Sequence, residues 1–213
     1  MVGCISGNGS TLKPLVIVPR KTMEDELRIY GYGQKEVEVV HQKNGFMTMK
    51  IFEHWGEAIF LSEVRRRRER SGYKGKALLI LDGMSAHSTE RFIGKCVTEN
   101  IHPYFLVAHT SDQVQMLDLL TFGLMKNFIS RSTFQMGISP QTNQLVKMLG
   151  AWHQATPPHL VIAAFNAAGM IQYFKQGMMF LKVDLSAAKK LRIYERSPIE
   201  SPTKRIVLPN FEE

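Results

Sequence analysis

The run that decides the fold of this chain is apolar and ends in an acid and a glycine: Ala77-Leu78-Leu79-Ile80-Leu81-Asp82-Gly83. An unbroken leucine and isoleucine run of this length predicts a strand that is buried on both faces of a sheet. The carboxylate of Asp82 would then lie at the rim of that sheet. Asp82 could equally open a turn or cap the following helix, because Asp-Gly is a common turn pair.

Two strands are expected before this run, at residues 2–6 and 15–18. They are joined by Gly7-Asn8-Gly9-Ser10, and Asn-Gly between apolar segments favours a hairpin, so we expect antiparallel pairing. Residues 21–34 are charged and contain glycines, which predicts a loop with little regular structure. Residues 36–39 alternate in polarity and predict a short edge strand.

From Asn44 onward, large apolar side chains recur at three- and four-residue steps: Met49, Phe52, Trp55, Ile59 and Phe60. This period predicts an amphipathic helix packed on the sheet, with Asn44 or Thr48 as its cap. The helix ends in the run Arg65-Arg66-Arg67-Arg68. Arginines in a last turn suit the helix dipole and are otherwise solvated. Contact with a DNA backbone, or a nuclear-localisation signal, is the alternative.

After Asp82 we expect a short helix over residues 89–100 and a buried strand over residues 104–107. Another helix should begin at Thr110, which stands in capping-box spacing with Gln113. In that helix Asp118 shares a stripe with apolar residues, so it should not face open water. A carboxylate among apolar neighbours is costly unless a cation or hydrogen-bond donors meet it. Asp118 is therefore a candidate site residue.

Taken as a whole, the sequence predicts three regions. Residues 1–133 form the α/β core. Residues 134–185 form a helical extension, with one helix from Ser139-Pro140 to about residue 153 and a second over 160–168. Residues 186–213 form a basic, mobile tail.

The net charge of +8 and the pI near 9.5 favour a polyanionic partner such as nucleic acid. The two cysteines, Cys4 and Cys96, lie far apart and have no metal-ligand spacing, which is typical of a reducing, intracellular setting. No run approaches the length of a membrane span, and no signal peptide is evident, so we expect no membrane partner.

Asp82 and Asp118 could hold a cation together if the strand and the helix pack side by side. Magnesium uses a few carboxylates together with water and substrate phosphates. Paired magnesium ions can activate the attacking oxygen and stabilise the leaving oxygen of a phosphodiester. Chemistry alone leaves this shared metal site as one hypothesis, since spacing does not prove contact.

Two longer segments, Ala77 to His87 and His109 to Lys126, resemble the DDE superfamily endonuclease domain. More narrowly, they resemble the pogo/Tigger transposases, a branch of the mariner superfamily. The resemblance extends upstream to residues 9–17 and 44–47, and more weakly to about residue 170. It implies an RNase H-like mixed sheet flanked by helices and a Mg²⁺ or Mn²⁺ site made of three carboxylates. It also implies cleavage of DNA at transposon ends followed by strand transfer.

On this resemblance Asp82 matches the second acid of the triad and Asp118 the third. His87 and His109 match histidines that flank the site and could contact phosphate or tune a carboxylate, although a hydrogen-bonded structural role is the expected one for each. Lys126, in the matching segment, and residues 65–68 are further candidates for contact with DNA.

The first acid of the triad normally lies on a strand upstream of the Gly9-Ser10 segment, and the first aspartate here, Asp25, lies past the second expected strand. We therefore expect a relic truncated at its N-terminus, which lacks the first strand and is inactive alone. A domesticated DNA- or protein-binding module is the alternative, and a product without function is a third. A nuclear location and a homo-oligomer are further expectations.

Overall fold

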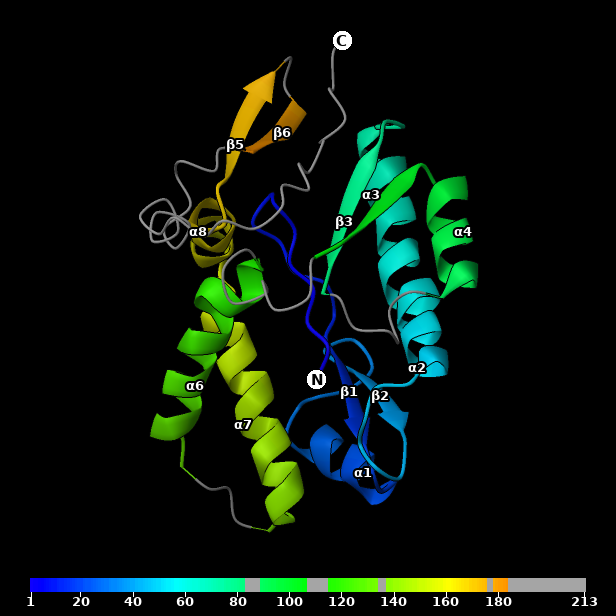
Figure 1. Cartoon of the computed structure of the whole chain (residues 1–213). Coiled ribbons are helices and arrows are strands. Elements are labelled where there is room, and N and C mark those ends of the chain that lie inside the picture. The colour runs from blue at the N-terminus through cyan, green and yellow to red at the C-terminus, as the bar shows by residue number, and fades with distance from the viewer. Residues whose placement is uncertain (83–88, 107–114, 134–136, 176–177, 184–213) are drawn as a thin grey trace, which may run out of the picture.

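The computed structural model describes residues 1–82, 89–106, 115–133, 137–175 and 178–183, with side chains described only as far as residue 170. Within these residues the fold is mixed α/β, and strands β1 to β4 lie between two groups of helices (Figure 1). In chain order the elements are β1 (Leu15–Val18), α1 (Thr22–Ile29), β2 (Glu38–His41), α2 (Met49–His54), the π-helical segment η1 (Trp55–Leu61), α3 (Ser62–Ser71), β3 (Ala77–Leu81), α4 (Glu90–Thr98), β4 (Ile101–Phe105), the π-helical segment η3 (Leu117–Thr121), α6 (Phe122–Arg131), α7 (Pro140–Ala155), α8 (Pro158–Ala167), β5 (Met170–Lys175) and β6 (Met178–Val183).

The described strands form three two-stranded sheets. β1 pairs with β2 and β3 with β4, both in parallel, while β5 and β6 are antiparallel. The predicted edge strand near residues 36–39 is confirmed as β2, two residues further along. The strand expected at residues 104–107 is β4, which begins earlier, at Ile101, opposite Ala77. The β5–β6 hairpin was not predicted.

Strand β3 has the predicted bounds, but the prediction that both of its faces are buried was wrong. Leu79 and Leu81 are buried in a cluster that includes Phe92 of α4. Leu78, on the opposite face, is 54% exposed, and only Ile80 on that face packs against a buried cluster. Strand side chains alternate between two faces, and in this structure helices cover one face fully and the other only near the end of the strand.

The antiparallel pairing expected near the N-terminus is confirmed, although residues 2–6 form isolated bridges rather than a regular strand. The backbone N–H of Val2 donates to the carbonyl of Leu15 at 2.7 Å, and the N–H of Leu15 donates back at 3.0 Å. The turn between the two segments is also as predicted, since Asn8 Oδ1 accepts from the backbone N–H of Ser10 at 3.1 Å.

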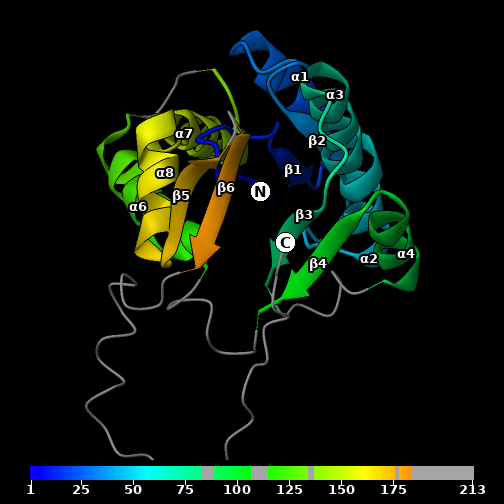
Figure 2. The same cartoon turned by 90° about the horizontal axis from the view of Figure 1, so that it is seen from above.

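This N-terminal segment runs between the two groups of helices (Figure 2). Gly3 lies against the ring of Trp152 on α7, and a Cβ at position 3 would lie 2.5 Å from that ring. Only glycine allows this approach without displacing the buried tryptophan. Ile5 packs against the two buried clusters that contain Trp152 and Phe165, so the segment connects α7 and α8 to the strands.

Segments α2, η1 and α3 form one continuous helix from Met49 to Ser71, which confirms the predicted amphipathic helix. Thr48 is its cap, because its hydroxyl accepts from the backbone N–H of Ile51 at 3.3 Å. The buried face of this helix carries an aromatic cluster, in which the rings of Phe52 and Phe92 pack edge to face with their centroids 5.0 Å apart. The helix expected at residues 89–100 is confirmed as α4.

The loop expected over residues 21–34 was wrong, because α1 occupies Thr22–Ile29. Met23 and Leu27, four residues apart, are both buried and give the helix its apolar side. Glu24 and Arg28 add an ion pair at 2.5 Å one turn apart.

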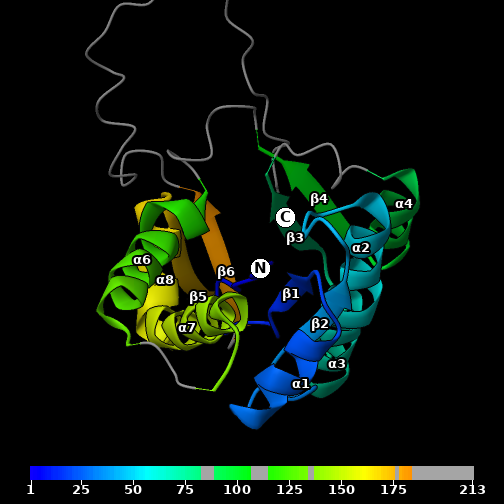
Figure 3. The same cartoon turned by 90° about the horizontal axis from the view of Figure 1, so that it is seen from below.

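Helices α6, α7 and α8 lie together on the other side of the strands (Figure 3). The two helices predicted from Ser139 and Leu160 are confirmed as α7 and α8, and the Ser139 hydroxyl caps α7 by accepting from the N–H of Thr142 at 3.3 Å. The capping pair Thr110 and Gln113 and the tail over 186–213 lie outside the described residues. None of the described helices has the length and apolar character needed to cross a membrane.

Candidate metal centre

Asp82 directly follows β3 at the end of its ladder with β4. The ladder continues to this point, since the N–H of Leu106 donates to the carbonyl of Leu81 at 2.8 Å. By strand alternation Asp82 belongs to the face of Ile80, the side turned toward α8 and η3. The side chain is half-buried, and its Oδ1 atom is fully buried. The prediction of an acid at a strand end is therefore confirmed.

Asp118 lies in the first turn of the helix that begins at Met116 and continues through α6. Its backbone N–H donates to the carbonyl of Gln115 at 3.0 Å. The side chain is half-buried, as the stripe pattern predicted, and the neighbouring Leu117 and Leu119 pack into two different apolar clusters. An acid in a first helical turn also complements the helix dipole, which is the structural alternative for this residue.

The two acids are connected through one buried cluster. Met116 and Phe165 belong to this cluster, and Ile80 of β3 and Leu119 of η3 pack against it. Asp82 lies two residues beyond Ile80, and Asp118 immediately precedes Leu119. The end of β3 and the first turn of η3 therefore border the same apolar core.

Among the described residues no group of three His, Cys, Asp or Glu side chains is placed to hold a metal ion. Asp25, the first aspartate of the chain, lies on α1 with a side chain that is 76% exposed, and it is 3.9 Å from Arg28. It is therefore part of a helix-surface ion pair.

Sequence reasoning missed two buried polar atoms close to Asp118. Neither Oε1 of Gln115 nor Oγ1 of Thr121 has a hydrogen-bond partner in the described part of the chain. The signal was present in the sequence, since Gln115 and Thr121 are polar residues in a mainly apolar segment, three positions before and after Asp118. With Asp82 and Asp118 they offer only oxygen atoms, which is the donor chemistry of Mg²⁺, Mn²⁺ and Ca²⁺. The donor set therefore fits a hard divalent cation.

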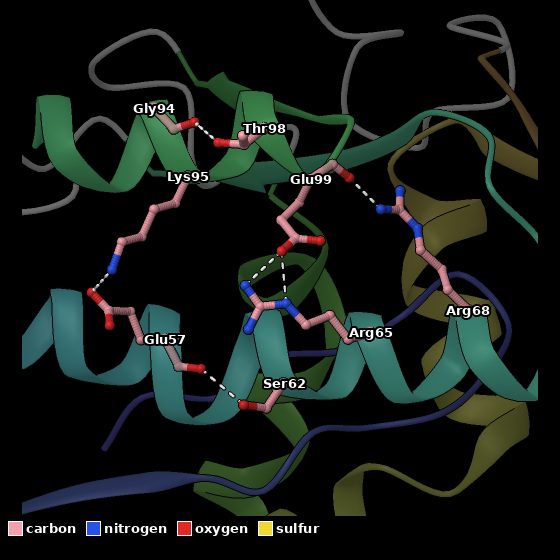
Figure 4. Close-up of polar contacts among 8 residues, drawn as sticks. All are labelled: Glu57, Ser62, Arg65, Arg68, Gly94, Lys95, Thr98 and Glu99. Carbon is pink, nitrogen blue, oxygen red and sulfur yellow. Dashed lines mark hydrogen bonds and ion pairs between the residues drawn. The ribbon is translucent and has the colours of Figure 1, made fainter.

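The side chains of the arginine run bind other residues of the protein, as Figure 4 shows for Arg65 and Arg68. Arg65 Nε donates to Glu99 of α4 at 2.7 Å, while Arg66 and Arg67 both bind Glu63 at 2.7 Å. Arg68 donates to three backbone carbonyls, those of Glu99, Gly75 and Asn100. Three of these four cations are thus paired with carboxylates, which lowers the positive potential that the bare sequence suggests.

Lys126 and the arginine run lie far from each other. Lys126 is exposed on α6, whereas residues 65–68 belong to α3, and the two helices lie on opposite sides of the strands in all three views (Figures 1 to 3). Lys126 shares one continuous helix with Asp118, two turns further along. His87 and His109, the remaining candidates for phosphate contact, lie outside the described residues.

A surface groove of about 510 Å³ lies between the long helix and α4, away from both acids. Its lining consists of Lys50, Glu53, His54, Glu57, Ala58, Arg65 and Arg91. Because acidic and basic side chains alternate there, and Glu57 pairs with Lys95 and Arg91 of α4, the groove has no strong preference for an anion or a cation.

Comparison with known proteins identifies the family but no individual relative. No curated protein and no solved structure matches the chain. The family described as DDE superfamily endonuclease matches residues 1–167, which include both acids and all helices up to α8. The chain therefore belongs to the DDE superfamily endonucleases.

Proposed function

We propose that this chain is a transposase-derived nucleic-acid-binding domain whose ancestral activity is metal-dependent DNA cleavage and strand transfer, and that it does not cleave DNA alone. The observation that carries the proposal is the placement of Asp82 and Asp118 around one apolar core, the first at a strand end and the second in a helix turn. Family membership supports a nuclease ancestry and a DNA partner.

Asp82 and Asp118 are proposed to hold a Mg²⁺ or Mn²⁺ ion through their carboxylate oxygens. Such an ion, when bound, activates an attacking oxygen and stabilises the leaving oxygen of a phosphodiester. The half-buried position of both acids keeps part of the bulk water away and strengthens their attraction for a cation. Two carboxylates neutralise only half of the charge of two dications, so two ions should bind much more weakly than in a three-acid site.

Finer assignments belong to the same proposal. The segments 77–87 and 109–126 support the pogo/Tigger branch and an RNase H-like fold. His87 and His109 are proposed to contact phosphate or to tune the acids. A nuclear location follows from a DNA partner, and a homo-oligomer is proposed on the family resemblance.

Cation binding and DNA cleavage should be measured on the same preparation. We expect Mn²⁺, followed by electron paramagnetic resonance, to bind the chain weakly, and Asp82→Asn or Asp118→Asn to reduce that binding by roughly tenfold or more. Asp25→Asn is the matched control, because it removes an exposed aspartate and should change nothing. Supercoiled plasmid incubated with Mg²⁺ should remain intact.

Either of two results would contradict the proposal. Equal Mn²⁺ binding by the Asp25→Asn and Asp82→Asn variants would show that Asp82 does not hold the cation. Efficient nicking by the wild-type chain that is lost in Asp82→Asn would show that the chain is a complete enzyme.

A second candidate is a domesticated binding module without catalysis, which attaches to DNA through the arginine run. The favouring observation is that Arg65 and Arg66 keep side-chain exposures of 52% and 56% despite their ion pairs. Each arginine could release its glutamate partner and bind a DNA phosphate in its place. The salt experiment in the Discussion separates this candidate from the first.

A further inference from the structure

Gln115 carries a buried amide oxygen that has no hydrogen-bond partner in the described part of the chain. A buried polar atom without a partner is unfavourable, and native proteins contain few of them. Such atoms commonly mark a position for a water molecule or an ion. The buried side-chain oxygen of Gln115 therefore marks a candidate position for a bound ligand.

The backbone places Gln115 at the start of the helical turn that carries Asp118. The carbonyl of Gln115 accepts from the N–H of Asp118 at 3.0 Å and from the N–H of Leu119 at 3.1 Å. Residues three apart around a helical turn are neighbours, with about 5–6 Å between their Cβ atoms. The amide of Gln115 and the carboxylate of Asp118 therefore emerge from the same turn.

Helix capping does not explain the Gln115 side chain. Thr48, Thr89 and Ser139 precede other helices, and the hydroxyl of each accepts from a backbone N–H in the first turn. Gln115 holds the same position before Met116, but its side-chain oxygen accepts no such bond. The backbone carbonyl of Gln115 accepts hydrogen bonds from the first helical turn, whereas its side-chain oxygen takes no part in capping the helix.

We infer that Gln115 supplies a neutral oxygen ligand to the divalent cation held by Asp118. This inference rests on the proposed function, since it requires the cation site at Asp82 and Asp118. Amide carbonyl oxygens bind hard divalent cations alongside carboxylates.

Binding of Mn²⁺ to the full chain, followed by electron paramagnetic resonance, tests this role without any activity assay. Gln115→Leu should weaken Mn²⁺ binding roughly tenfold. Gln115→Glu keeps the length of the side chain and adds a negative charge, so it should strengthen binding by a similar factor. Gln144→Leu, which replaces an exposed glutamine on α7, should leave binding unchanged.

The outcomes separate this inference from the proposed function. If Asp118→Asn abolishes Mn²⁺ binding while both Gln115 variants bind as wild type does, the role of Gln115 is wrong and the metal site stands. If the wild-type chain binds no Mn²⁺, both fail. If Gln115→Leu does not fold, Gln115→Glu decides alone, since unchanged affinity there overturns the role.

Discussion

At the scale of single residues, Glu63 controls how much positive charge the arginine run presents. Its carboxylate accepts from Arg66 through two nitrogens, each at 2.7 Å, and from Arg67 Nε at 2.7 Å. These hydrogen bonds, the one from Arg66 foremost, lower the pKa of Glu63 from its ordinary 4.5 to about 2. Glu63 therefore stays ionised well into the acid range.

Stability of the folded chain should depend on Glu63 in a pH-dependent way. Since the pKa of Glu63 is lower in the folded than in the unfolded chain, its contribution is complete above about pH 4.5 and is lost as the pH falls toward 2. Glu63→Gln should lower the free energy of unfolding by about 1 kcal/mol at neutral pH, because the pair is partly solvated. Urea unfolding of both chains between pH 3 and 7 should show this difference shrinking in acid. Glu69→Gln, an exposed acid of the same helix, is the control; an equal loss there would assign the effect to helix charge.

Which residues could be predicted at this scale depended on how far away the partner lies in the sequence. The positions of Asp82 and Asp118 on their strand and helix could be predicted from the sequence, because strand and helix periodicity is a local property. Glu99, which accepts from both Arg65 and Arg68, lies more than thirty positions away from them, so no local pattern could reveal these two contacts. Gln115 was missed because a single glutamine beside an acid has many explanations until burial is known.

At the scale of elements, Arg68 forms hydrogen bonds with the residues that precede two paired parallel strands, β3 and β4. It donates to the carbonyl of Gly75, just before β3, at 2.9 Å, and to the carbonyl of Asn100, just before β4, at 3.2 Å. The N–H of Ala77 also donates to the carbonyl of Asn100 at 3.1 Å. Arg68 therefore links the two residues that precede the paired strands, at the end of β3 opposite Asp82.

Removal of the Arg68 guanidinium should therefore destabilise the chain. Arg68→Met keeps most of the aliphatic stem but leaves three carbonyls without their charged donor, so we expect a loss of roughly 1.5–3 kcal/mol in the free energy of unfolding. Arg70→Met, which removes an exposed arginine of the same helix, should cost under about 0.5 kcal/mol. Equal effects of the two variants in chemical denaturation would show that Arg68 acts only through helix charge.

Elements with a strong period were predictable, and elements with mixed signals were not. The long helix, α4, α7 and α8 follow from apolar spacing and from the caps Thr48, Thr89 and Ser139. Helix α1 was missed because charges and glycines dominate residues 21–34, while its apolar side consists only of Met23 and Leu27. The exposure of Leu78 was missed because an apolar run does not reveal which face of a strand the helices cover.

At the scale of the whole molecule, the candidate DNA-contacting residues are divided between the two groups of helices. Lys126 lies on the side that carries Asp118, and Arg66 lies on the opposite side, on α3. Sequence analysis placed both among the residues that contact DNA, because the order of residues does not show that α3 and α6 face away from each other. These assignments remain predictions, as does the division of the chain after residue 133.

Salt titration of DNA binding should identify the face that is used. If the acid-bearing face binds DNA, Lys126→Gln should reduce the slope of log K against log salt by about 1, with little change in Arg66→Gln, whose wild-type side chain is occupied by Glu63. The reverse pattern would favour the binding module that attaches through the arginine run. The measurement is fluorescence anisotropy with a short duplex between low and physiological salt.

The contact of Gly3 and Ile5 with α7 and α8 has a consequence for biosynthesis. Gly3 and Ile5 are synthesised about 150 residues before their partners on α7 and α8, and at ribosomal speeds this delay is on the order of ten seconds. During that interval both residues lack their contacts with the two helices, which leaves this segment of the nascent chain accessible to chaperones and proteases.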